Sequence, residues 1–591
     1  MKFFKIIFIA AIFGFTIYSC SKAYLDKRPL GQLDETALAN KRGVEGLLIG
    51  AYSLLDGVGS SKSDIGSSGS NWIYGSVAGS EAYKGSELDD LAGDITVFEQ
   101  FVPTASNYPL STKWGVVYDG VQRANGVLRI MAKAKDISAA DQKRIAAEAR
   151  FLRAHYHFEA KKIWNKVPFI DETVTYENGN YRVSNDKDIW PDIETDLKYA
   201  VANLDVNPYQ GAVGRATKYT AMALLAKAYM FQKKFAEAKL LLEAIISSGK
   251  FHLVNYADNF NPATKNSPES VFSVQMSVND GAVGLNGNYG DAYNFPGTGI
   301  GPGGCCGFFQ PSQYLVNHFK TDPVTGLPDL DNFNNAGADV TSDEGYESSD
   351  PFTPHAGTLD PRLDWTVGRR AIPYLDWGNH PGKDYIRDQA NEGPYSPKKN
   401  IYYKSQETHL TDANFWGNIT TANNVNLIRY ADILLWAAEV ETEIGSIDKA
   451  EEYVNMIRTR AADSNGWVHT YIDPNDPTKG FTNTAAANYF IKPYPNGYFA
   501  AQGQAYARKA IRYERMLEFG MEGHRFFDLV RWGIADNEIN AYIQKEKTMR
   551  TYLNSKVFTK NKNEYFPIPQ TQIDLSAGVD GVKKMKQNPG Y

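Results

Sequence analysis

The feature that most restricts the fold of this chain is a helical hairpin at residues 215–249. Apolar side chains recur there in two series, which are Tyr219, Met222, Leu225 and Tyr229, then Phe235, Ala238, Leu242 and Ile245. Their three- and four-residue spacing places each series on one face of a helix. The polar break at residues 232–234 is too short to cross a domain. We therefore expect the two helices to fold back as an antiparallel pair.

The hairpin is not unique in the sequence. Six of its residues match the 34-residue tetratricopeptide pattern in type and spacing, namely Leu225, Ala226, Tyr229, Phe235, Ala238 and Leu242. A second hairpin is expected over residues 425–461, where Ala438, Ile447, Ala450 and Val454 repeat four of those offsets. A third helical run covers residues 143–164, with residues 188–204 as its expected partner. The sequence thus predicts a mostly α fold whose scaffold is tetratricopeptide-like helix pairs, with the apolar stripes as core.

The rest of the chain divides into helical and irregular stretches. We expect the helical scaffold at about residues 35–56, 112–249 and 425–461, and a C-terminal helix at about 505–533. The irregular portion covers about residues 57–100, 250–424 and 466–500, with one short strand at 271–276. Residues 281–307 carry ten glycines with aromatic residues between them. A long irregular loop of this kind is usually functional, and its aromatic residues argue against disorder.

Charge and motifs narrow the class of function. The net charge of −6 and pI near 5.9 argue against nucleic acid as a partner. The sequence contains no H-E-x-x-H, G-x-S-x-G or P-loop motif. Its one dinucleotide-like match, at Gly299, Gly301 and Gly304, is interrupted by Pro302 and is treated as chance. His155 and His157 point to different faces of a helix and do not form a metal pair. We expect no catalysis, no cofactor and no metal.

Aromatic residues supply the candidate binding site. They make up 13% of the chain, and many lie in polar, glycine-rich stretches. An exposed ring covers the C–H face of a sugar, while nearby amides and hydroxyls bond its rim. One predicted platform is Trp72, Tyr74 and Tyr83, which lie among Ser and Gly, with core or loop packing as the alternative for each single ring. A second is Tyr289, Tyr293, Phe308 and Phe309, with Trp365 and Trp377 as weaker candidates.

The N-terminus predicts a lipoprotein. Lys2 and Lys5 precede an apolar run at residues 6–18 that is too short to span a bilayer. The run ends at Ser19-Cys20, similar to a bacterial lipobox, so residues 1–19 are interpreted as a signal peptide and Cys20 as the lipidated first residue. An ordinary secretory signal is the alternative. Residues 20–591 are predicted to form one domain.

Two smaller features have two interpretations each. Cys305 and Cys306 are adjacent, and we favour two free or buried thiols over a vicinal disulfide that shapes a loop. Residues 321–350 hold eight acidic and no basic side chains. A solvated loop is the favoured interpretation of that segment, and weak calcium binding without an EF-hand pattern is the other.

Several motifs in order resemble the SusD/RagB-like outer-membrane lipoproteins of Bacteroidetes. They are Cys20–Asp26 (CSKAYLD), Phe151–Ala154 (FLRA) with Val167-Pro168, Leu427–Asp432 (LIRYAD), Arg512–Arg515 (RYER), Glu522–Gly533 (EGHRFFDLVRWG), Tyr565–Pro569 (YFPIP) and Gln587–Tyr591 (QNPGY). The resemblance spans nearly the whole chain. It implies about four tetratricopeptide-like helix pairs and an irregular ligand-binding half.

The resemblance also implies a function. Such proteins are lipid-anchored at the outer membrane, facing the cell exterior, and act with a SusC-like TonB-dependent transporter. Their glycan contacts come from aromatic residues in the early irregular stretch and in the loop between the third and fourth helix pairs, where both predicted platforms lie. We expect a non-catalytic protein that captures oligosaccharide. The alternatives are a lipoprotein glycoside hydrolase, a tetratricopeptide-type assembly scaffold, and a binder of peptide cargo.

Overall fold

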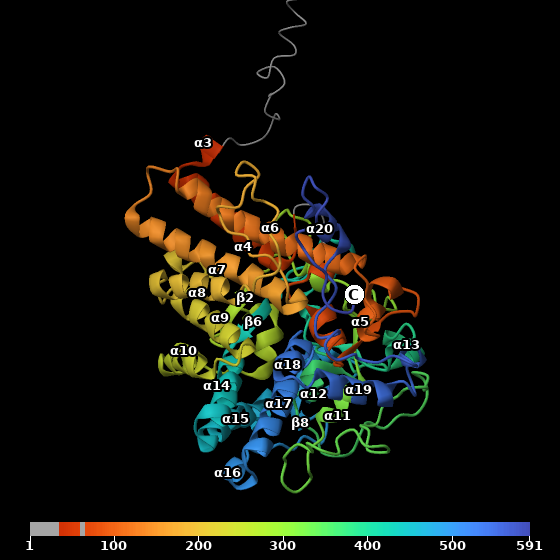
Figure 1. Ribbon diagram of the computed structural model, residues 1–591. Coiled ribbons are helices and arrows are strands. Elements are labelled where there is room, and N and C mark those ends of the chain that lie inside the picture. Colours follow the sequence, from red (N-terminus) through yellow and green to blue (C-terminus); the bar gives the residue numbers. More distant parts are fainter. Residues whose placement is uncertain (1–34, 60–64) are drawn as a thin grey trace, which may run out of the picture.

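The computed structural model describes residues 35–59 and 65–591 (Figure 1). The predicted signal peptide at residues 1–19 and the lipidation site at Cys20 lie outside these ranges. Within them, no helix is long and apolar enough to cross a membrane.

The scaffold is a succession of packed helices along one side of the molecule, orange through yellow to cyan in Figure 1. In chain order these are α3 (Glu35–Leu38), α4 (Lys41–Ser53), α6 (Tyr108–Met131), α7 (Ala139–Trp164), α8 (Trp190–Asn203), α9 (Lys218–Phe231), α10 (Phe235–Ser247), α14 (Tyr430–Ile444) and α15 (Ile447–Ala462). From α4 onwards, each helix of this set packs against the next. They form four pairs, α4–α6, α7–α8, α9–α10 and α14–α15, as predicted. The mostly α fold is confirmed.

The hairpin α9–α10 shows how the pattern makes a pair. Thr217 caps α9 by accepting a hydrogen bond from the backbone N–H of Thr220 at 3.2 Å. Lys233 then turns the chain in the left-handed region, with φ of 56°. In α10 only one stripe is buried, Ala238, Leu242 and Ile245. The apolar periodicity therefore marks the face that contacts α9 and α14.

The remaining elements build the irregular half, mostly green loops on the opposite side of Figure 1. Its strands pair in four two-stranded antiparallel sheets: β1 (Ala82–Gly85) with β3 (Phe308–Pro311), β2 (Ser270–Val274) with β6 (Val425–Arg429), β4 (Val367–Gly368) with β5 (Ser396–Pro397), and β7 (His469–Tyr471) with β8 (Phe481–Ala485). The other helices are α5 (Val97–Glu99), α11 (Gln313–His318), α12 (Leu363–Thr366), α13 (Gln389–Glu392), α16 (Tyr498–Gln502), α17 (Gln504–Phe519), α18 (Arg525–Trp532), α19 (Ala535–Glu546) and α20 (Gln570–Leu575). The strand predicted at 271–276 is confirmed as β2.

Two helix predictions need correction. Residues 425–429 form β6, because this segment pairs with β2 before α14 begins. The single C-terminal helix is two helices, α17 and α18, separated at residues 520–524. Gly523 there has φ of 75°, and a side chain on it would collide with the backbone of Ser70. Gly75 in turn lies against the backbone of Gly523. This close approach of two distant segments requires glycine.

A buried ionic network joins the scaffold to the irregular half. Arg429, at the end of β6, contacts Glu269, Glu518 at 3.0 Å and Glu522 at 2.9 Å. All four side chains are at least nine-tenths buried. Arg362 contacts Asp360 at 2.7 Å and also Glu518 at 3.0 Å. A buried charge destabilises the folded state unless it has partners of opposite charge. Removing one member of the network is therefore expected to leave the others without a partner and to lower the stability of the protein.

The structure also settles the cysteine pair and shows how the acidic segment is held. Cys305 and Cys306 form a disulfide, so the expectation of two thiols is wrong and the alternative of a vicinal bridge holds. The acidic segment at 321–350 is tied to basic side chains outside it, through the pairs Asp339–Lys545, Glu344–Arg550, Glu347–Lys383 and Asp331–Lys509. Within residues 35–59 and 65–591 there is no group of three His, Cys, Asp or Glu side chains suited to a metal ion.

Candidate functional site

Five of the aromatic residues predicted as ligand contacts are buried: Trp72, Tyr74, Tyr83, Phe308 and Phe309. The exposed fraction of Trp72 is 1%, its indole N–H donates to the carbonyl of Gly290 at 3.1 Å, and its ring centroid lies 5.4 Å from that of Phe309. The hydroxyl of Tyr83 donates to Glu546 at 2.6 Å. The prediction that these five rings form open stacking platforms is therefore wrong.

The weaker candidates, Trp365 and Trp377, are half-buried and held by their indole N–H groups. Trp365 donates to the carbonyl of Gly466 at 2.8 Å, and Trp377 donates to that of Tyr402 at 2.9 Å. Both rings pack against core clusters of the irregular half. Neither tryptophan is in the lining of the cleft that contains Tyr289 and Tyr293.

Tyr289 and Tyr293, two of the predicted residues, line an open cleft together. This cleft, called here the aromatic cleft, has about 390 Å³ of space for water-sized molecules, within the range of small-ligand pockets. Its lining is Ile65, Leu91, Asp94, Ile95, Tyr108, Pro109, Tyr289, Ala292, Tyr293, Phe415, Trp416 and Ile419. Four segments of the irregular half and the start of α6 therefore meet at one hollow.

Polar residues on its far side hold the turn that carries the two tyrosines. The carboxylate of Asp291 accepts hydrogen bonds from the Ser70 hydroxyl at 2.6 Å and from the Asn288 side-chain amide at 2.8 Å. Asp291 is buried, and burial raises the pKa of its carboxyl group. Asp291 is not in the lining of the aromatic cleft, whereas Tyr289 and Tyr293 are. The turn therefore presents its carboxylate and its two aromatic rings to different sides.

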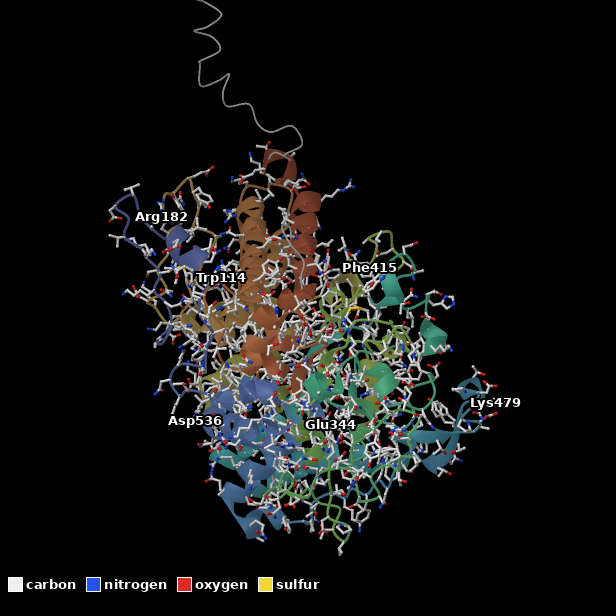
Figure 2. The ribbon with its side chains drawn as sticks, turned by 90° about the vertical axis from the view of Figure 1, so that its right-hand side faces the viewer. Trp114, Arg182, Glu344, Phe415, Lys479 and Asp536 are labelled. Carbon is white, nitrogen blue, oxygen red and sulfur yellow. A yellow bond between two sulfur atoms is a disulfide. The ribbon has the colours of Figure 1, made fainter. Side chains whose placement is uncertain are left out.

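Phe415 and Trp416 form the opposite wall and were not among the predicted residues. Asp412 holds their loop by accepting hydrogen bonds from the backbone N–H groups of Gly284 at 2.8 Å and Asn414 at 2.9 Å. The Phe415 ring meets that of Tyr289 edge-on, with centroids 5.8 Å apart. Trp416 is 64% exposed. Figure 2 shows Phe415 on the same side of that view as Lys479, with Arg182 and Asp536 on the other. The adjacent pair Phe415-Trp416 before Gly417 was the missed signal.

The third wall comes from the start of α6 and the preceding loop. Tyr108 is 42% exposed at the first position of α6, where Asn107 caps the helix by accepting from the backbone N–H of Leu110 at 3.1 Å. The side-chain amide of Asn107 also donates to the carbonyl of Asp94 at 3.0 Å. One carboxylate, Asp94, and several ring faces thus border the aromatic cleft. This arrangement suits an apolar ring face with hydroxyls at its edge.

Comparison with known proteins agrees with this architecture. Residues 268–591 match the SusD family, and residues 24–230 match a family described as starch-binding, associating with outer membrane. The chain is similar to SusD-like protein P25 of Formosa agariphila, with 26% identity over 541 residues that cover 88% of this chain and 89% of the relative.

Solved structures share the fold. Surface glycan-binding protein A from Bacteroides fluxus has a TM-score of 0.64 at 21% identity, covering 93% of this chain and all of that one. Surface glycan-binding protein A from Bacteroides thetaiotaomicron in complex with laminarihexaose has a TM-score of 0.59 at 20% identity, covering 93% of this chain and 99% of that one. The family match extends over more than half of the chain, and the solved relatives share its fold. The chain therefore belongs to the SusD family.

Proposed function

We propose that this protein is a non-catalytic, surface-anchored glycan-binding protein that captures an oligosaccharide and delivers it to a SusC-like TonB-dependent transporter. The observation that carries the proposal is the aromatic cleft, where the exposed ring of Trp416 and the half-exposed rings of Tyr289, Tyr293 and Phe415 surround one hollow. Aromatic faces of this kind bind the C–H faces of sugars.

The lining of the aromatic cleft favours a neutral glycan. Its residues include one acid, Asp94, and are otherwise uncharged. A sulfated or uronic-acid chain would meet a like charge at Asp94 without a basic partner in that lining. A solved relative of the same fold was determined with laminarihexaose, a neutral glucan fragment. We therefore expect neutral β-glucan fragments to be the first class to test.

The alternative of a glycoside hydrolase has less support. Hydrolysis of a glycosidic bond in most families uses a pair of carboxylates on either side of the bond. The lining of the aromatic cleft offers Asp94 alone. Peptide cargo and a purely structural helical scaffold remain outcomes of the tests below.

The location rests on the sequence and on the family. We propose that Cys20 carries the lipid and that the protein faces the cell exterior at the outer membrane, with the transporter as partner. A family match described as associating with outer membrane supports this location. Replacing Cys20→Ala should abolish lipid labelling and release the protein from the membrane fraction. Retention of the variant at the wild-type level would contradict the lipid anchor.

The decisive experiment is a binding screen with an aromatic variant. Protein beginning at residue 21 would be tested against a panel of soluble polysaccharides, laminarin among them, and against peptides. Trp416→Ala should weaken binding of the positive glycan about tenfold or more, because a truncated hot-spot ring typically loses about 2 kcal/mol.

A matched control makes this screen interpretable. Tyr176 is also strongly exposed, at 82%, but lies outside the aromatic cleft, so Tyr176→Ala should leave binding unchanged. Equal glycan affinity in Trp416→Ala and wild type would refute the proposed site. Release of reducing ends by the purified protein would refute the non-catalytic assignment.

A further inference from the structure

A second, smaller cavity lies behind the segment that carries the two tyrosines of the aromatic cleft. Its wall is dominated by asparagine side chains, namely Asn288, Asn294, Asn400, Asn423, Asn424 and Asn426. It offers about 60 Å³ for the centres of water molecules, which is room for more than one water. Residues 288–294 separate the two hollows, with Tyr289 and Tyr293 lining one and Asn288 and Asn294 lining the other. We call the second hollow the asparagine cavity.

Two of the asparagine residues that line the cavity have unsatisfied hydrogen-bonding groups. Asn294 is 1% exposed, and neither its side-chain oxygen nor its side-chain nitrogen has a partner in the structure. Asn288 is 4% exposed, and its side-chain oxygen also lacks one, while its amide nitrogen donates to Asp291. Buried polar groups of folded proteins are nearly always paired. A donor and two acceptors on one wall therefore indicate a polar occupant.

The charges around the asparagine cavity indicate that this occupant is neutral. The ammonium group of Lys399 contacts Glu522 at 2.6 Å, so each offsets the other. Asp291 is already bonded by Ser70 and Asn288. An anion would meet the carboxylates of Asp291 and Glu522, and a cation would meet the ammonium group of Lys399 and the amide N–H groups of Asn294. A ligand with hydroxyls satisfies both the donor and the acceptors.

The remaining wall of the asparagine cavity is apolar and leaves an entrance. Phe309 and Met521 are buried and offer carbon surface beside the amides. Phe260, Asn400 and Val425 are half-buried and form the outer rim. A carbon skeleton with hydroxyls on one side would place its C–H groups on these apolar residues and its hydroxyls on Asn288 and Asn294.

We infer that the asparagine cavity is a binding site for a small neutral polyol, either free or as a hydroxyl-bearing arm of a larger carbohydrate. The inference does not require the aromatic cleft to bind glycan, because the two hollows have different walls. Its ligand is recognised by hydrogen bonds to buried amides, and ring stacking on Tyr289, Tyr293, Phe415 and Trp416 plays no part.

The test uses glycerol as the probe and 1-propanol as the comparator, titrated into the protein and followed by ligand-observed NMR. Glycerol should bind the wild type more tightly than 1-propanol. Asn294→Leu removes both unpaired amide atoms at similar volume, so glycerol affinity should fall at least about tenfold. Its melting temperature should stay level or rise, because an unpartnered buried amide is removed. The exposed Asn537→Leu is the matched control and should bind glycerol like wild type.

A second variant keeps the test decisive if Asn294→Leu does not fold. Val425→Trp fills the rim and leaves the asparagine amides in place, and it should also abolish glycerol binding. Equal glycerol binding by wild type and either folded variant would overturn the inference, as would equal affinity for glycerol and 1-propanol. Trp416→Ala should keep glycerol binding intact, which separates this site from the aromatic cleft. Loss of laminarihexaose binding in Asn294→Leu would assign the ligand to an arm of a glycan, and its retention to a free polyol.

Discussion

Two groups of aromatic residues in the irregular half have similar neighbours in the sequence but differ in exposure: one group is buried and the other is open to solvent. Trp72 is followed within a few residues by glycine and serine, and it is 1% exposed. Trp416 also lies beside glycine and asparagine, and it is 64% exposed. A polar, glycine-rich neighbourhood is therefore no guide to whether a ring is open.

The difference arises from what the glycines do. Around Trp72, Gly75 permits a distant backbone at Gly523 to come into contact, so the segment is covered. Beside Trp416, Gly417 takes φ of 65° and turns the loop, with the carbonyl of Gly303 as its nearest neighbour. Gly75 therefore lets a distant backbone cover the segment of Trp72, whereas Gly417 turns a loop that leaves Trp416 exposed.

The largest effect should come from the buried ring of Trp72. Trp72→Ala should destabilise the protein by about 3–5 kcal/mol, because it leaves a cavity and removes the hydrogen bond to Gly290. Chemical denaturation measures this loss. Glycan affinity per folded molecule should be unchanged. If Trp72→Ala lost glycan affinity without losing stability, Trp72 would be a ligand contact and not a core residue.

A smaller effect is expected for a buried hydroxyl. The Tyr83 hydroxyl donates to Glu546 and accepts from the backbone N–H of Gln313 at 3.2 Å. Tyr83→Phe should reduce the free energy of unfolding by about 1–3 kcal/mol, since two buried groups lose a partner. Tyr289→Phe, in the open group, should leave the unfolding curve where it is. Similar curves for both variants would contradict the division into buried and open rings.

Phe415 tests the open group by its function. Phe415→Ala removes the edge contact with Tyr289 and should weaken glycan binding about tenfold, or about 1.4 kcal/mol, in calorimetric titration. Phe415→Tyr keeps the ring and should retain most of the affinity. If Ala and Tyr at this position bind equally, the ring has no part in recognition.

The smallest effect concerns pH and a ring buried in the scaffold. Burial lowers the pKa of His157 to about 3, and its Nε2 accepts a hydrogen bond from the backbone N–H of Ile170. Because the folded pKa lies below the unfolded value near 6.5, the contribution of His157 is present above about pH 6.5 and is lost progressively as pH falls toward 3. At pH 6 the loss from this group should be about 0.8 kcal/mol.

A matched pair of histidine variants isolates this effect. His157→Gln should lose less stability than wild type between pH 7.5 and pH 6, measured by urea denaturation at each pH. His252→Gln, which replaces an exposed histidine, is measured in the same way as the control. An unchanged pH dependence in His157→Gln would show that this imidazole does not contribute.

The helical scaffold could be predicted from the sequence, because helices that pack together have apolar residues at regular three- and four-residue spacing. The spacing around Leu225 and Leu242 identified α9 and α10, and the family motifs led to the four pairs. The contact of Gly523, between α17 and α18, with Ser70 left no such pattern, because it joins residues far apart in the chain.

The site was predicted only in part, for a related physical reason. Tyr289 and Tyr293 were found from composition, and they do line the aromatic cleft. Phe415, Trp416 and Tyr108 join them from other stretches through loop anchors such as Asp412 and Asn107. Exposure is decided by these long-range contacts, which residue types alone do not reveal.

The contact between Gly75 and Gly523 has a consequence for how the chain reaches its folded state. Trp72 contacts Gly290 and Phe309, and Gly75 in the same segment packs against Gly523. Gly523 is synthesised nearly 450 residues after that segment. When the first three helix pairs have been synthesised, the segment around Trp72 does not yet have the residues that bury it in the folded protein. We therefore expect fragments that stop before residue 523 to be retained by chaperones or degraded, even though they contain most of the repeats.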